Sequence, residues 1–156
     1  MATDPTVVKN LQTSCAVLAH MAEQFRVDEK NLKNMDLDWL AARVDKWYGK
    51  AECHLGKFIK RLLYYGVDPK YDCGSVTNAA DVESLLKSAL AMSSAALDQF
   101  NEFRQQAWEA KAGYLPDLYE HAIDDLEHIV YKAQRELKLI DGLTEPGYIG
   151  ARLEDG

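Results

Sequence analysis

Apolar residues recur every three or four positions through most of the chain, and this spacing limits the fold more than any other feature. The pattern covers four stretches: Thr6 to about Lys33, Asp36 or Asp38 to Gly66, Asp81 to about Ala107, and Leu115 to Ile140. Such spacing places apolar side chains along one face of an α-helix, whereas a half-buried strand would alternate. The sequence therefore predicts an all-α chain of four amphipathic helices.

The connections between the predicted helices differ in length. The first and third are short breaks around residues 34–36 and 113–116, which favour antiparallel neighbours. The middle connection, Val67 to about Ala79, contains Pro69 and Gly74 and has no helical pattern. Roughly a dozen residues are enough to run the length of a bundle, so the helices on either side can lie parallel. The predicted architecture is a four-helix bundle with a long crossover between its second and third helices.

Composition limits the function classes. The 156 residues predict one domain, 1–156. Eighteen basic against 25 acidic residues give a net charge of −7 without a basic run, which argues against a nucleic-acid partner. Three unevenly spaced cysteines suggest neither a disulfide framework nor a zinc site, and no stretch resembles a signal peptide or a membrane span. We expect a cytoplasmic protein that does not associate with membranes.

The fourth predicted helix carries a motif typical of metal sites in helical bundles. Asp125 and His128 are three residues apart, so their side chains can converge on one ion from neighbouring parts of a helix face. His54 lies on the buried face of the second predicted helix. A helical wheel, however, places His128 toward the polar side of its helix, so a solvated Asp125–His128 pair is the competing interpretation.

Several short sequence motifs make the chain resemble the bacterioferritins, the haem-containing branch of the ferritin superfamily. They are Val7-Val8-x-x-Leu11, His54 followed by Ile59-x-Arg61-x-Leu63, Gly66-x-x-Pro69, Ser88-x-Leu90-Ala91, Asp125-x-x-His128-Ile129 and Gly150-Ala151-Arg152-Leu153-Glu154-Asp155-Gly156. The resemblance implies a ferritin-like four-helix bundle with a short C-terminal fifth helix. It also implies hollow 24-subunit shells that oxidise ferrous iron at a di-iron site and store the mineral.

The metal ligands that the resemblance implies are only partly present. Three of the four carboxylate positions hold other residues: Leu18, Ala51 and Ser93. His54 and His128 keep the two imidazoles, and Asp125 stands at the remaining carboxylate position. One carboxylate leaves most of the charge of two ferrous ions uncompensated in a bundle core. We expect no normal ferroxidase centre, and two alternatives remain: a single ion on His54, Asp125 and His128, or the favoured metal-free arrangement, in which Asp125 accepts a hydrogen bond from a neutral histidine.

The haem position that the resemblance implies is altered as well. The ligating methionine of the family corresponds to Glu52, and a carboxylate does not usually replace a thioether on haem iron. We therefore expect no bis-methionine haem. The other residues of this twofold interface are small or charged: Ala19, Ala22, Glu23, Arg26, Asp45 and Gly49. They are compatible with a haem pocket sealed by ion pairs, or with room for a different cofactor.

The resemblance predicts a bacterioferritin-like cage subunit that stores or binds iron with impaired or absent ferroxidase activity. Such a subunit would assemble as a homo-oligomer, as a twofold dimer or a 24-mer, or with an active bacterioferritin as its inactive partner. The alternative is a non-catalytic helical bundle that binds another cofactor or a protein at the altered interface. An enzyme with one metal ion on His54, Asp125 and His128 is a third reading, so the sequence leaves the enzymatic status open.

Overall fold

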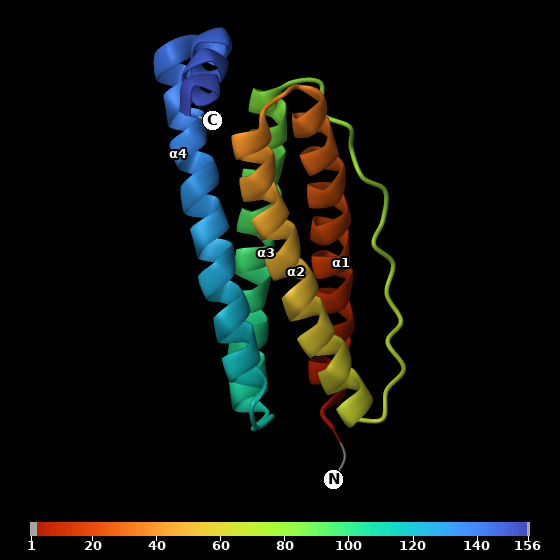
Figure 1. The fold of residues 1–156 in the computed structure, drawn as a ribbon. Helices are drawn as coiled ribbons and strands as arrows, with labels where there is room; N and C mark the ends of the chain where they lie inside the picture. Colours follow the sequence, from red (N-terminus) through yellow and green to blue (C-terminus); the bar gives the residue numbers. More distant parts are fainter. Residues whose placement is uncertain (1–2, 156) are drawn as a thin grey trace.

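The computed structural model describes residues 3–155, which form four helices and no strand. The helices are α1 (Pro5–Asn34), α2 (Asp38–Tyr64), α3 (Val82–Glu109) and α4 (Leu115–Asp155). Figure 1 shows them side by side as a long bundle. The prediction of an all-α four-helix bundle is confirmed. Met1, Ala2 and Gly156, which belong to the expected domain 1–156, lie outside the described residues.

Two antiparallel hairpins make up the bundle. Helices α1 and α2 form one, α3 and α4 form the other, and residues 65–81 connect them. This connection runs from one end of the bundle to the other along the outside of α1, so α2 and α3 point the same way (Figure 1). The long crossover expected from the sequence is therefore present.

Polar side chains of α1 hold the crossover in place. Gln24 is almost fully buried and binds Thr77 twice, as a donor to its carbonyl oxygen at 2.8 Å and as an acceptor from its N–H at 2.8 Å. Gln12 makes the same kind of double contact with Asp68 and Lys70. The crossover has no helix or sheet to satisfy its backbone, so these side chains take over that role.

The predicted start of the second helix is wrong in one detail. Asp36 or Asp38 was the expected capping residue, but the cap position is held by Leu37, which makes no side-chain capping bond. Asp36 has a φ of 60° in the turn, and Asp38 is already the first helical residue. By contrast, Asp81 caps α3 by accepting a hydrogen bond from the Ser84 N–H at 2.7 Å.

The apolar faces meet in one continuous core. Near one end of the bundle, Phe58, Phe100 and Tyr119 pack against one another with ring centroids 4.8–5.8 Å apart. The Tyr119 hydroxyl is satisfied by the Ser14 hydroxyl at 2.8 Å. The buried residues of all four helices belong to this one core. Their positions follow the predicted apolar stripes.

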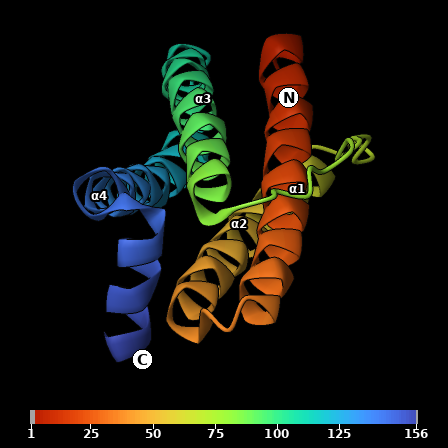
Figure 2. The ribbon, with the colours of Figure 1, turned by 90° about the horizontal axis from the view of Figure 1, so that it is seen from above.

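The C-terminal residues belong to α4 rather than to a separate helix. Helix α4 extends through Asp155, with non-helical backbone at Thr144 (φ 61°, ψ 164°), and Pro146 follows. The axis turns sharply there, so the last residues run at an angle to the rest of α4, beside the beginning of α2 (Figure 2). The short fifth helix that the resemblance implies is therefore not a separate element here, and its residues lie in α4 beyond the kink. Proline cannot donate the helical hydrogen bond, which explains a break near this position.

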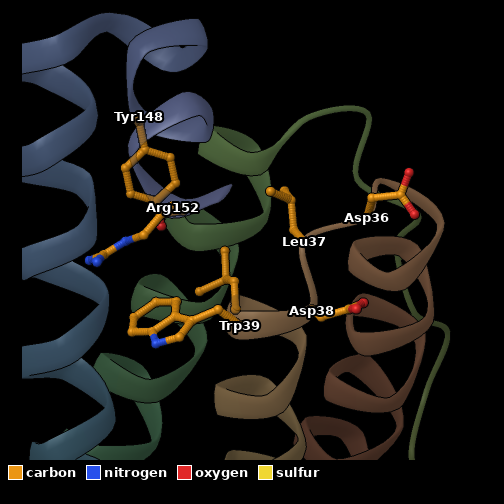
Figure 3. Close-up of a pocket in the computed structure, with 7 residues that line it drawn as sticks. Asp36, Leu37, Asp38, Trp39, Tyr148 and Arg152 are labelled. Carbon is orange, nitrogen blue, oxygen red and sulfur yellow. The ribbon is translucent and has the colours of Figure 1, made fainter. Parts of the chain in front are cut away.

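The turned segment is anchored to the bundle. Glu145 accepts a hydrogen bond from the Glu83 N–H at 2.8 Å, and Tyr148 is buried. Arg152 lies between Tyr148 and Trp39 beside a pocket of about 100 Å³ (Figure 3). Its guanidinium carbon is 4.2 Å from the Trp39 ring centre. These contacts tie the C-terminal segment to the beginnings of α2 and α3.

Candidate functional site

The central layer of the bundle contains a histidine–carboxylate pair that joins α2 to α4. The Nε2 atom of His54 lies 2.5 Å from Oδ2 of Asp125. Because the apolar stripe of α2 turns His54 inward, its ring is buried, while Asp125 is partly exposed at the edge of the layer. The Nζ atom of Lys50 lies 3.8 Å from the other carboxylate oxygen of Asp125. The Asp125 carboxylate therefore lies between the His54 imidazole and the Lys50 ammonium.

Apolar side chains fill most of the remaining space. A cavity of about 10 Å³ borders the pair, at the lower limit of what holds one water molecule. Its other walls are Lys50 and six apolar residues: Leu18, Met21, Ala51, Ala122, Leu126 and Ile129. Leu18 and Ala51 stand where the resemblance implies glutamates, so apolar atoms occupy the space that two carboxylates would need.

The environment of His54 favours the neutral imidazole. Burial lowers the pKa of His54 below its ordinary value of 6.5, and the hydrogen bond to Asp125 opposes this only in part. A neutral ring that donates its Nε2–H to Asp125 satisfies both groups. Because the unfolded chain binds a proton more readily than native His54 does, this histidine costs stability as the pH falls below about 6.5.

The structure does not bring His128 and Ser93 to the pair. His128 is exposed on the outer face of α4, as its position on the helical wheel suggested. Ser93 is fully buried on α3, but it does not border the cavity, and its hydroxyl has no hydrogen-bond partner within the protein. Of the three metal candidates, only His54 and Asp125 share the layer.

These residues do not fit a di-iron centre. In the part of the chain that the structure describes, no three His, Cys, Asp or Glu side chains are grouped so that they could hold a metal ion. Ferrous iron prefers several carboxylate and imidazole ligands, and His54 and Asp125 together supply only two. The pair can serve as a structural hydrogen bond, but it lacks the ligands that would hold two iron ions for oxidation.

The altered haem-interface residues border an open hollow on the outside of α1 and α2. Its volume is about 580 Å³, and its walls include five of the seven predicted residues: Ala19, Ala22, Glu23, Arg26 and Glu52. Leu55 and the crossover residues Tyr71, Asp72 and Cys73 complete the walls. Asp45 and Gly49 do not border it. Neither of these two positions therefore contributes to the hollow.

An ion-pair network covers one side of this hollow. Arg26 donates a hydrogen bond to the Tyr48 hydroxyl at 2.8 Å, and that hydroxyl donates to Glu52 at 2.5 Å. The Arg26 guanidinium also lies 3.6 Å from Glu52 and 3.9 Å from Glu23. Glu52 is thus engaged with Tyr48 and Arg26 and offers no soft ligand, so a bis-methionine type of haem site does not fit.

Sequence reasoning missed two residues that shape these sites. Lys50 precedes His54 by one helical turn, so the i, i+4 spacing could have paired them on one face of α2. Tyr48 precedes Glu52 by the same interval and could have been found in the same way. The crossover walls Tyr71 to Cys73 carried no such signal, because no local spacing relates them to α1.

Helices α2 and α3 run parallel, the long crossover joins them, and a histidine–carboxylate pair lies inside the bundle. These features define a helical bundle of the ferritin-like class. The family model for the ferritin-like domain matches residues 8–143, and the chain belongs to this family. Proteins of the family store or bind iron and typically form oligomers. A comparison with curated proteins found no match. No helix within residues 3–155 is long and apolar enough to span a lipid bilayer.

Proposed function

We propose that this chain, as a single ferritin-like domain, is a bacterioferritin-like subunit that stores or binds iron within an oligomer and has little or no ferroxidase activity. The observation that carries the proposal is the composition of the central layer. His54 and Asp125 are hydrogen-bonded to each other there, and Leu18 and Ala51 occupy positions where iron ligands would be needed. Such a subunit can contribute to a shell without oxidising iron, alone or as the inactive partner of an active subunit.

Oxidation kinetics test the catalytic part of this proposal. We expect slow oxidation of ferrous iron by the natural chain, measured by stopped-flow absorbance under air. Replacing Leu18, Ala51 and Ser93 together with glutamate is expected to raise the rate at least about tenfold, because even residues outside the first ligand sphere change metal-site activity about 10–100-fold. The matched control carries glutamine at the same three positions, with the same shape but no charge. Rapid oxidation of two ferrous ions per natural subunit would contradict the proposal.

The mass and the visible spectrum of the purified particle test the structural part. We expect light scattering at micromolar concentration to give a multiple of the 17.6 kDa subunit mass, from a twofold dimer up to a 24-mer. We also expect no haem absorption, because Glu52 is engaged by Tyr48 and Arg26. A monomer of 17.6 kDa would contradict the oligomer, and a haem spectrum would contradict the altered interface.

The second candidate function is a non-catalytic bundle that binds a different cofactor or a protein at the altered interface. The hollow beside Arg26 and Glu52 favours it, because its volume of about 580 Å³ is within the range of ligand sites. The small floor residues Ala19 and Ala22 leave this space open. A coloured particle without haem bands, or a particle that co-purifies with an organic ligand, would favour this candidate over iron storage.

A further inference from the structure

The Asp125 carboxylate faces two different partners on α2. Oδ2 lies 2.5 Å from Nε2 of His54, and Oδ1 lies 3.8 Å from Nζ of Lys50. Lys50 and His54 are four residues apart, so both side chains leave the same face of α2. Both oxygens of the carboxylate that borders the cavity are thus turned toward donors of one helix.

We propose that the Lys50 ammonium is the resident cation of this layer and that it keeps divalent metal ions away from His54 and Asp125. The inference rests on the proposed function and deepens it, because it names a charge that opposes metal binding in the central layer, in addition to the missing ligands. It concerns metal binding alone, so it can be tested without measuring iron oxidation.

The charges around the cavity carry this inference. Among the described residues that border it, Asp125 supplies one negative charge and Lys50 one positive charge. A divalent ion held by His54 and Asp125 would have to share the carboxylate with the ammonium and would be repelled by it. Removing the ammonium leaves the carboxylate available to an incoming ion, without changing either potential ligand.

The position of Lys50 makes the exclusion electrostatic rather than steric. Its side chain is 60% exposed, and its long stem lets the ammonium swing toward water, so it does not plug the cavity. Changing its charge therefore leaves the packing of Leu18 and Ala51 intact. This separates Lys50 from the apolar walls as a cause of weak metal binding.

Cobalt titration followed by NMR provides the test. Co²⁺ is paramagnetic and broadens the ring signals of a histidine that it approaches, so even weak binding at His54 is visible in the natural chain. We expect Lys50→Ala to lower the Co²⁺ concentration that half-broadens the His54 signals about tenfold relative to the natural chain, because a like charge is removed next to the ion. Lys50→Arg keeps the charge and is expected to behave like the natural chain.

A matched control removes the same charge elsewhere on the helix. Lys60 is also exposed on α2 but lies about 9 Å along the helix from His54, more than one Debye length at physiological salt. Lys60→Ala is therefore expected to change the half-broadening concentration less than about twofold. Equal broadening in the natural chain and in Lys50→Ala would overturn the inference while leaving the proposed function intact. Strong broadening of the natural chain at micromolar Co²⁺ would also overturn it.

A variant with an added carboxylate allows the same comparison at higher metal affinity. Ala51→Glu adds a carboxylate three residues before His54, and Co²⁺ binding is then measured by calorimetry with Lys50 present and with Lys50→Ala. We expect about tenfold tighter binding without Lys50. Because this variant changes a buried alanine, the NMR comparison in the natural chain decides the question if the variant fails to fold.

Discussion

Replacing Arg152 with methionine is expected to lower the free energy of unfolding by about 3 kcal/mol, since it removes one partner of a buried ion pair. The other partner, Glu136, is 2% exposed on α4. Arg152 contacts both of its carboxylate oxygens, at 2.5 Å and 3.1 Å. After the substitution, the hydrogen bond from the Tyr148 hydroxyl at 2.5 Å is the one that remains to this carboxylate among the described side chains. A buried charge with one neutral donor is costly.

The measurement is urea unfolding followed by circular dichroism at a fixed protein concentration, because assembly also stabilises the native state. Arg135→Met is the matched control: Arg135 precedes Glu136 on α4 but is exposed, and we expect a change below about 0.5 kcal/mol. Adding Glu136→Gln to Arg152→Met removes the stranded charge and is expected to restore part of the loss. A loss below about 1 kcal/mol for Arg152→Met would show that the turned segment is not held by this pair.

Asp28→Asn is expected to stabilise the protein by up to about 3 kcal/mol at pH 7.5 and by only about 1 kcal/mol at pH 4.5. Asp28 is 1% exposed on α1, and burial raises the pKa of its carboxyl from 3.8 to about 6. Gln24 donates to one oxygen at 2.9 Å, while the other has no hydrogen-bond partner within the protein. Charging this group in the folded state is therefore unfavourable.

The direction of this pH dependence follows from the protons that the folded and unfolded chains bind. Between about pH 4 and pH 6 native Asp28 holds its proton while the unfolded chain has released it, so stability falls as the pH rises through this window. Asparagine keeps the shape and the acceptor for Gln24 but carries no charge. Urea unfolding of both proteins at several pH values measures the difference. Asp124→Asn, an exposed carboxylate on α4, is the control. A stability difference that is the same at pH 4.5 and pH 7.5 would contradict the argument.

The His54–Asp125 pair shows which features of the site the residue spacing within one helix could predict. The apolar stripe of α2 was enough to place His54 in the core, and the wheel position of His128 agreed with its exposure on α4. Both inferences depend only on the 3.6-residue period of one helix. That His54 meets Asp125 was suggested by the family resemblance. The 3.8 Å approach of Lys50 to the same carboxylate followed from neither source, because it depends on how α2 and α4 pack.

The sequence by itself determined the four helices, the long crossover and most of the core, because apolar periodicity and the length of a connection act within one segment. Tertiary structure alone decided that Leu37 rather than an aspartate is the N-cap of α2, that Gln24 holds the crossover, and that α4 bends at Thr144 so that Arg152 reaches Glu136. Each of these depends on which buried polar groups find partners when distant segments meet. An unsatisfied buried group is costly, and the packed bundle settles such pairings only as a whole.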